Sequence, residues 1–179
     1  MTEKRIRQIT FSGMFLALCI VLPFLTGQIP QIGAMLSPMH IPVLICGFVC
    51  GPVWGLAVGA VAPILRSVLF GMPKMFPSAV CMLFELAAYG AFAGLFIRIL
   101  PKKGWAVYAA LILAMLAGRI VWGAAQYFFL GINGTVFTVD MFIAGAFLNA
   151  VPGIILHIAL IPPIVMMLGK AGLNLNGTR

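Results

Sequence analysis

Three charged side chains lie inside long apolar segments of the sequence, and they are the first candidates for chemistry. They are Arg66, Glu85 and Arg119. A charge inside a membrane is costly, so each is a functional hypothesis by default. Glu85 and Arg119 fall near the middles of consecutive apolar segments joined by a short loop, so we expect them to meet at similar depth on antiparallel helices. They form either a structural ion pair or a pair that also borders a ligand.

Arg66 has no acidic residue at its own expected depth, in the outer third of its segment. Its long side chain can extend to the membrane interface or pack against apolar groups, which is the favoured interpretation. The alternative is that Arg66 binds a carboxylate or phosphate of a ligand, because a guanidinium is a fork-shaped donor that matches such groups.

A second group of candidates shares one face of the apolar segment that contains Arg119. Arg119, Trp122 and Gln126 stand at positions i, i+3 and i+7, which lie on one face of a helix. They offer a charge, an aromatic plate and an amide. Mostly apolar pockets with a few placed polar groups are typical of small-molecule sites. For Trp122 alone, packing against lipid or core is an equally good explanation.

Further polar candidates stand on other segments. Tyr89 lies one helical turn from Glu85, Asn149 lies about two turns into the last apolar segment, and His40 precedes an Ile-Pro pair at the start of another. Asn149 is equally well explained by an interhelical hydrogen bond. His40 and His157 each lack a second His, Cys or acid at metal-ligand spacing, so we expect no metal. No nucleophile with a base, no phosphate-binding loop and no cofactor motif is present, so we expect no enzyme activity.

The composition requires that these residues be positioned by membrane helices. Of the 179 residues, 63% are hydrophobic and 8% are charged, whereas a soluble domain has about a quarter charged residues. Residues 8–65 contain no Lys, Arg, Asp or Glu, and a run of about 18 apolar residues is enough to span a membrane. The four cysteines also lie in apolar segments and are expected to be small buried hydrophobes.

The net charge of +8 does not indicate nucleic-acid binding, because the basic residues are grouped beside apolar segments. Most of them form three groups: Lys4, Arg5 and Arg7; Arg98, Lys102 and Lys103; and Lys170 with Arg179. This pattern indicates cytoplasmic ends of membrane helices.

Hydropathy and turn residues predict an all-α bundle of six transmembrane helices in a single domain, residues 1–179. The expected helices cover residues 8–25, 39–50, 53–69, 78–97, 105–130 and 141–168. The second would be only about 18 Å long, short of an apolar core about 30 Å thick, so one kinked helix over residues 39–69 is the alternative. Six helices place the basic loop 98–104 and both termini in the cytoplasm, whereas five would place that loop outside.

Small residues recur at four-residue spacing and predict close helix packing. They are Gly47, Gly51, Gly55 and Gly59, then Ala87 with Ala91 and Gly90 with Gly94, and Gly13 with Ala17. Packing within the chain is the simplest explanation for any one pair.

The segment Leu36–Gly59 (LSPMHIPVLICGFVCGPVWGLAVG) carries a family resemblance. It resembles the signature region of the substrate-binding S components of energy-coupling factor (ECF) transporters. That pattern consists of an apolar lead, His-Ile-Pro-Val, a glycine-rich short helix, Gly-Pro and a second glycine-rich helix. The chain's length, its six expected helices and its basic ends are also similar to those of S components.

The resemblance implies a membrane subunit of the bacterial plasma membrane that binds a vitamin or related micronutrient. It also implies partners: a separate transmembrane coupling subunit and two ATPases, which supply the motor that this chain lacks. The Gly13 and Ala17 face matches the family's docking face for the coupling subunit, although one of the usual alanines is a glycine here. The segment Gln28–Ser37 matches the loop that covers the pocket, and the outer halves of the last three helices supply most other contacts.

The choice of substrate rests on the same segment and on the balance of charges inside the membrane. The His-Ile-Pro-Val segment is most similar to pantothenate- and riboflavin-type members, and the excess of membrane arginine over membrane acid favours an anion such as pantothenate. Flavin, folate, pyridoxine and queuosine-precursor ligands remain open. A small stand-alone secondary transporter, a membrane enzyme and a structural subunit are the competing classes.

Overall fold

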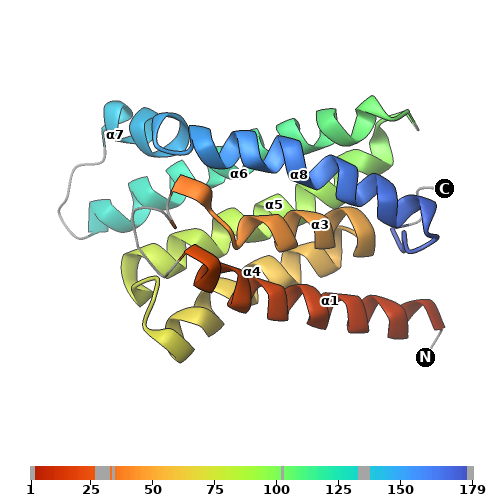
Figure 1. The fold of residues 1–179 in the computed structure, drawn as a ribbon. Coiled ribbons are helices and arrows are strands. Elements are labelled where there is room, and N and C mark those ends of the chain that lie inside the picture. Colours follow the sequence, from red (N-terminus) through yellow and green to blue (C-terminus); the bar gives the residue numbers. More distant parts are fainter. Residues whose placement is uncertain (1–2, 27–32, 34, 102, 133–137, 177–179) are drawn as a thin grey trace.

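The computed structural model describes residues 3–26, 33, 35–101, 103–132 and 138–176, which contain helices and no strand. Its elements form one bundle (Figure 1). They are α1 (Glu3–Val21), the 3-10 turn η1 (Leu22–Thr26), α3 (His40–Cys50), α4 (Pro52–Phe70), the irregular turn η2 (Met75–Ala79), α5 (Val80–Ile99), α6 (Trp105–Ile132), α7 (Val139–Ile143), the π-helical turn η3 (Ala144–Leu148) and α8 (Val151–Lys170).

The all-α membrane architecture expected from the sequence is confirmed. Within the described residues, five helical stretches are long and apolar enough to cross a membrane: Glu3–Leu25, Pro52–Phe70, Met75–Ile99, Trp105–Ile132 and Val139–Lys170. The sixth helix, α3, has 11 residues and a length of about 16 Å. It is too short to cross alone, so six complete spans remain a prediction.

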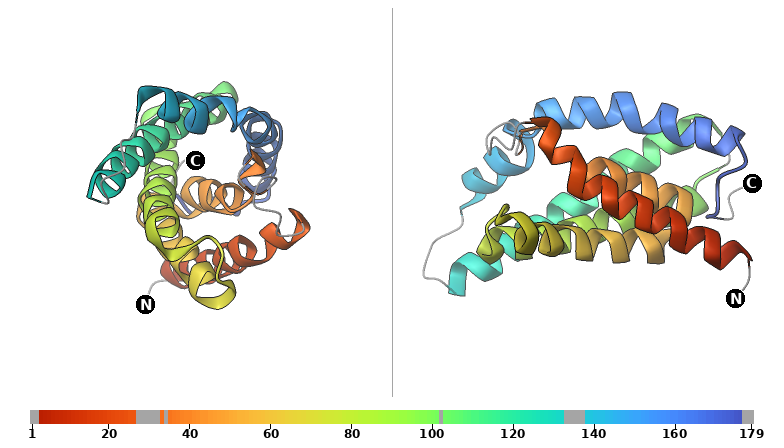
Figure 2. Two further views of the ribbon diagram at one scale, coloured as in Figure 1. Left: turned by 90° about the vertical axis from the view of Figure 1, so that its left-hand side faces the viewer. Right: turned by 60° about the horizontal axis from the view of Figure 1, so that its bottom comes forward.

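Helix α3 lies at the centre of the bundle, and every one of its residues is buried. Figure 2 shows it enclosed by the longer helices. The expected separation from α4 is confirmed, because Gly51 adopts φ 105° between the two helices. That conformation favours glycine, and Pro52 then begins α4 at a position where its missing N–H is no loss.

Glycines bring α5 into backbone contact with α3 and α4. A Cβ atom on Gly47, Gly55 or Gly90 would overlap backbone atoms of another helix. Gly59 and Gly94 are equally crowded. The small-residue faces of these three helices therefore serve packing within the chain, as expected. Gly13 differs, because a Cβ there would meet open space.

The prediction of one continuous helix over residues 141–168 is wrong. The chain forms α7 and η3, turns at Asn149 and Ala150, and begins again as α8. Pro152 in the first turn of α8 explains the break. It lacks a backbone N–H, and its ring would clash with the carbonyl four residues earlier in a continuous helix.

Both ends of the described chain and the connection between α5 and α6 lie at the same end of the bundle (Figure 1). The basic residues of the described chain that belong to these three regions are Lys4, Arg5, Arg7, Arg98, Lys103 and Lys170. Positive charge is therefore concentrated at one end, which we call the basic end. Lys102 and Arg179 lie outside the described residues.

The glycine contacts generate a stability prediction. Gly90→Ala should destabilise the protein by about 1–3 kcal/mol, because the added methyl overlaps the α4 backbone at Gly55. Gly13→Ala is the matched control, since it fills open space on a helix and removes a flexible glycine. Thermal unfolding of detergent-purified protein measures both. Equal melting temperatures for the two variants would contradict the packing described.

Candidate functional site

A buried ion pair joins Glu85, in the second turn of α5, to Arg119 at the middle of α6. Arg119 Nη1 lies 3.2 Å from Glu85 Oε1, and the two residues are only 8% and 2% exposed. The predicted meeting of Glu85 and Arg119 at similar depth is confirmed. Removing either partner of such a pair leaves an uncompensated charge in the interior and is strongly destabilising. The pair therefore fixes the register of α5 against α6.

His40, the first residue of α3, faces the same carboxylate oxygen. Its Nε2 lies 3.5 Å from Glu85 Oε1, and the side chain is buried. Glu85 thus gathers side chains from two further helices. All three side chains are almost completely buried. Their polar groups therefore interact in a low-dielectric interior.

Two more aromatic side chains complete what we call the polar cluster: His40, Glu85, Tyr89, Arg119 and His157. The Tyr89 ring meets His40 edge-on, with 5.1 Å between ring centroids. Gly118 of α6 leaves room for the Tyr89 ring. His157 of α8 stacks on His40 at 6.0 Å and an interplanar angle of 22°.

His157 was missed as a site residue by sequence reasoning, which tested it only for metal-ligand spacing. The signal that could have identified it is its position as an ionisable group inside an apolar segment. Sequence alone gives no indication that α8 packs beside the start of α3. Among the described residues, no group of three or more His, Cys, Asp or Glu is arranged to hold a metal ion.

Several buried polar atoms of the cluster make no hydrogen bond within the described chain. They are Nδ1 of His40, Nε of Arg119 and Nε2 of His157. Nε2 of His40 and Oε1 of Glu85 also belong to this group, because they have only the ion-pair contacts given above. Buried polar groups in folded proteins are nearly always hydrogen-bonded. A cluster with spare donors and acceptors is therefore suited to take up polar groups from a bound molecule.

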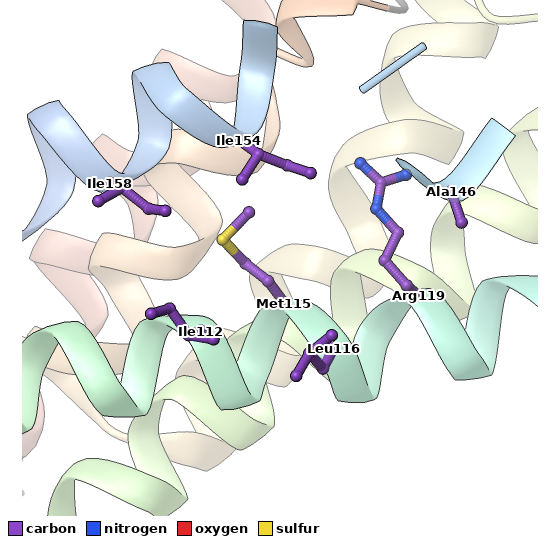
Figure 3. Close-up of a pocket in the computed structure, with 7 residues that line it drawn as sticks. All are labelled: Ile112, Met115, Leu116, Arg119, Ala146, Ile154 and Ile158. Atoms are coloured by element: carbon purple, nitrogen blue, oxygen red, sulfur yellow. The ribbon is translucent and has the colours of Figure 1, made fainter. Parts of the chain in front are cut away.

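A partly open apolar cavity of about 260 Å³ lies between α6, η3 and α8, and Arg119 stands at its edge (Figure 3). Its other lining residues are apolar: Ile112, Met115, Leu116, Ala146, Ile154 and Ile158. Six apolar side chains and one guanidinium give the composition expected of a small-molecule site. Arg119 therefore connects the cavity to the polar cluster.

A family model described as "ECF transporter, substrate-specific component" matches residues 7–168. The chain belongs to this family. Comparisons with curated proteins and with solved structures gave no match. As an S component, the protein is a substrate-binding subunit of a membrane transporter for micronutrient uptake rather than an enzyme. Membership agrees with the multi-pass helical architecture.

The S component's remaining α6 candidates do not join the polar cluster. Trp122 stacks with Phe142 at 6.3 Å between ring centroids, and Gly145 leaves room for its indole. Gln126 Oε1 accepts a hydrogen bond from Cys81 Sγ at 3.5 Å. These residues tie α6 to α5 and to the α7–η3 segment, closer to the end opposite the basic end.

Asn149 lies at the break before α8, and its side chain is exposed. The structure therefore does not bring it to the polar cluster, although it was expected about two turns inside a continuous helix. The difference follows from the helix break at Pro152, which leaves Asn149 in the turn before α8 rather than inside a continuous helix.

Arg66 is engaged in packing, which was the favoured interpretation. Its Nη1 donates a hydrogen bond to the Ile20 carbonyl at 2.6 Å. Its guanidinium carbon lies 5.2 Å from the Phe24 ring centroid and 5.4 Å from that of Phe70. These contacts join the end of α1 to α4 by a charge-assisted hydrogen bond and cation–π interactions.

Gln28 and most of the segment 27–34 lie outside the described residues. Gly13 and Ala17 are exposed on α1. The four cysteines are free thiols and buried, as expected from the sequence.

The ion pair generates a second prediction. Arg119→Ala should destabilise the S component by about 3–5 kcal/mol, because Glu85 keeps its burial and loses its partner. Adding Glu85→Gln to Arg119→Met should recover much of that stability by removing both charges. Detergent melting curves provide the measurement. A double variant no more stable than Arg119→Ala would show that the two charges are not coupled.

Proposed function

We propose that this S component captures a small vitamin-type molecule at the polar cluster and the adjoining cavity, and delivers it for import. The observation that carries the proposal is Arg119, which borders the cavity and is held by Glu85 at 3.2 Å. A guanidinium held by a carboxylate keeps its remaining N–H groups in a fixed direction. It can then receive an oxygen of the ligand.

Each site residue has a proposed role. Arg119 and His40 bind polar groups of the ligand, and Glu85 and Tyr89 hold them in place. Trp122 and Gln126 border the ligand from α6, and Gln28 covers it from the segment Gln28–Ser37. Arg66, which contacts α1 and Phe70, and Asn149, which lies in the turn before α8, do not reach the polar cluster. Their proposed role is to shape the end of the bundle opposite the basic end.

Pantothenate is the proposed ligand to test first. It has one carboxylate for a guanidinium and a flexible aliphatic body, and the cavity lining is aliphatic. Riboflavin and queuosine precursors are the alternatives. Their planar rings would favour the aromatic pair Trp122 and Phe142 instead, because flat rings stack on aromatic side chains.

Transport requires partners in this proposal. Gly13 and Ala17 lie on the exposed face of α1, and a small-residue face lets another membrane helix approach closely. We propose that a transmembrane coupling subunit docks there and that two ATPases drive the cycle. The basic end then faces the cytoplasm of a bacterial cell.

Binding is tested by equilibrium dialysis of detergent-purified protein against pantothenate and riboflavin, with mass spectrometry of any molecule that co-purifies. Met115→Trp should weaken binding tenfold or more, since its indole would fill the cavity. Leu113→Trp is the matched control on the same helix, because Leu113 is exposed and does not line the cavity. Equal binding by the two variants would place the ligand elsewhere, and a co-purified molecule would identify the ligand class directly.

Docking is tested by replacing Gly13 and Ala17 with Leu. The double variant should bind ligand normally and lose uptake in cells that carry the coupling subunit and ATPases, because the enlarged face excludes the partner helix. Ala124→Leu, at an exposed position on α6, should keep both properties. Uptake that persists in cells without the coupling subunit and ATPases would instead support a stand-alone secondary transporter.

A further inference from the structure

The inner end of α3 stops inside the bundle, where its last carbonyl groups have no partner within the helix. The final turn of any α-helix leaves such carbonyls. Here they are capped from two distant parts of the chain. The Leu175 backbone N–H donates to Val49 O at 2.8 Å, and Gln8 Nε2 donates to Cys50 O at 2.8 Å.

The next residue, Asn176, ties the same segment to α5 through a side chain that is only 3% exposed. Its Nδ2 donates to Gly94 O at 3.1 Å, and its Oδ1 accepts from Arg98 Nε at 2.6 Å. Gly51 makes the arrangement possible. A Cβ there would lie 2.8 Å from Asn176 Oδ1 and 2.9 Å from Arg98 Nη2.

We call Gln8, Arg98, Leu175 and Asn176 the base clamp. It joins α1, α5 and the segment that follows α8 to the end of α3. Arg98 also places a positive charge near a helix C-terminus, where the helix dipole favours it. The base clamp therefore restrains both the axial position and the rotation of α3.

The other end of α3 carries His40 of the polar cluster. Helix α3, which connects the base clamp to His40, is 11 residues long, or about 16 Å. It is buried along its whole length. Glycine contacts with α5 keep it from bending aside. A displacement at one end of such a helix is transmitted to the other.

We propose that the base clamp is a positioning device for the binding site, and that Asn176 sets the placement of His40 against Glu85 through α3. The assignment of His40 to ligand binding rests on the proposed function. The connection from the base clamp to His40 along α3 does not depend on it. The competing arrangement is local anchoring, in which Cys19 Sγ donating to Met39 O at 3.6 Å holds the outer end of α3 independently.

The sequence contains two histidines, which makes a direct test possible. Protein labelled with ¹⁵N-histidine should give two sets of imidazole signals in detergent, and His157→Gln assigns them. Asn176→Ala should shift the His40 signals while the protein stays folded. Lys170→Ala, an exposed residue on the same part of the chain, should leave them unchanged.

Two further variants keep the test decisive. Asn176→Asp retains an acceptor for Arg98 and loses the donor to Gly94 O, so it should give a smaller shift than Asn176→Ala. Gln8→Met removes the Cys50 cap from the α1 side and should also shift His40, even if Asn176→Ala fails to fold. Unchanged His40 signals in every folded clamp variant would overturn the proposal. The experiment uses no ligand, so its failure would leave the proposed capture function untouched, and a failure to bind any nutrient would leave this result standing.

Discussion

The burial of the Glu85 carboxylate is the constraint on which the rest of the structure depends. Glu85 is the one acidic residue of the sequence inside an apolar segment, and it is 2% exposed. A charge in that position needs compensation from nearby groups. Arg119 supplies the opposite charge, and His40 approaches the same oxygen. Three helices must therefore meet at one depth.

Close packing makes this meeting possible. Helix α3 reaches the polar cluster only because glycines let it lie directly against α5, with backbone facing backbone. The same approach buries all of α3 and removes it from contact with lipid. Its ends must then be satisfied by protein groups, since unsatisfied backbone polar groups are very unfavourable away from water. The base clamp meets this requirement at the end of α3, where Leu175 and Gln8 donate to its last carbonyl groups.

Much of this could be predicted from the sequence, because the strongest signals are local. Gly51-Pro52 separates α3 from α4, and a short loop places Glu85 near Arg119. The remaining features depend on contacts between distant segments. His157 gains its role only through packing of α8 beside α3, and Arg66 is occupied by the end of α1.

The break before α8 had a local signal, Pro152, but the apolar pattern on either side continues across it. Hydropathy alone therefore predicts one helix over residues 141–168. The consequence reached the site, because Asn149 lies at the break instead of on an inward face. The roles of Gly13, Ala17 and Gln28 remain predictions, since they concern a partner and a segment outside the described residues.

The four buried cysteines have a consequence of a different kind. Thiol oxidation and alkylation require an accessible thiolate, so the native fold shields all four sulfur atoms from oxidants and electrophiles. Damage of this type can reach the chain only after helices separate. Chemical lifetime under oxidative stress is thus governed by how often the bundle opens rather than by the intrinsic reactivity of its sulfur atoms.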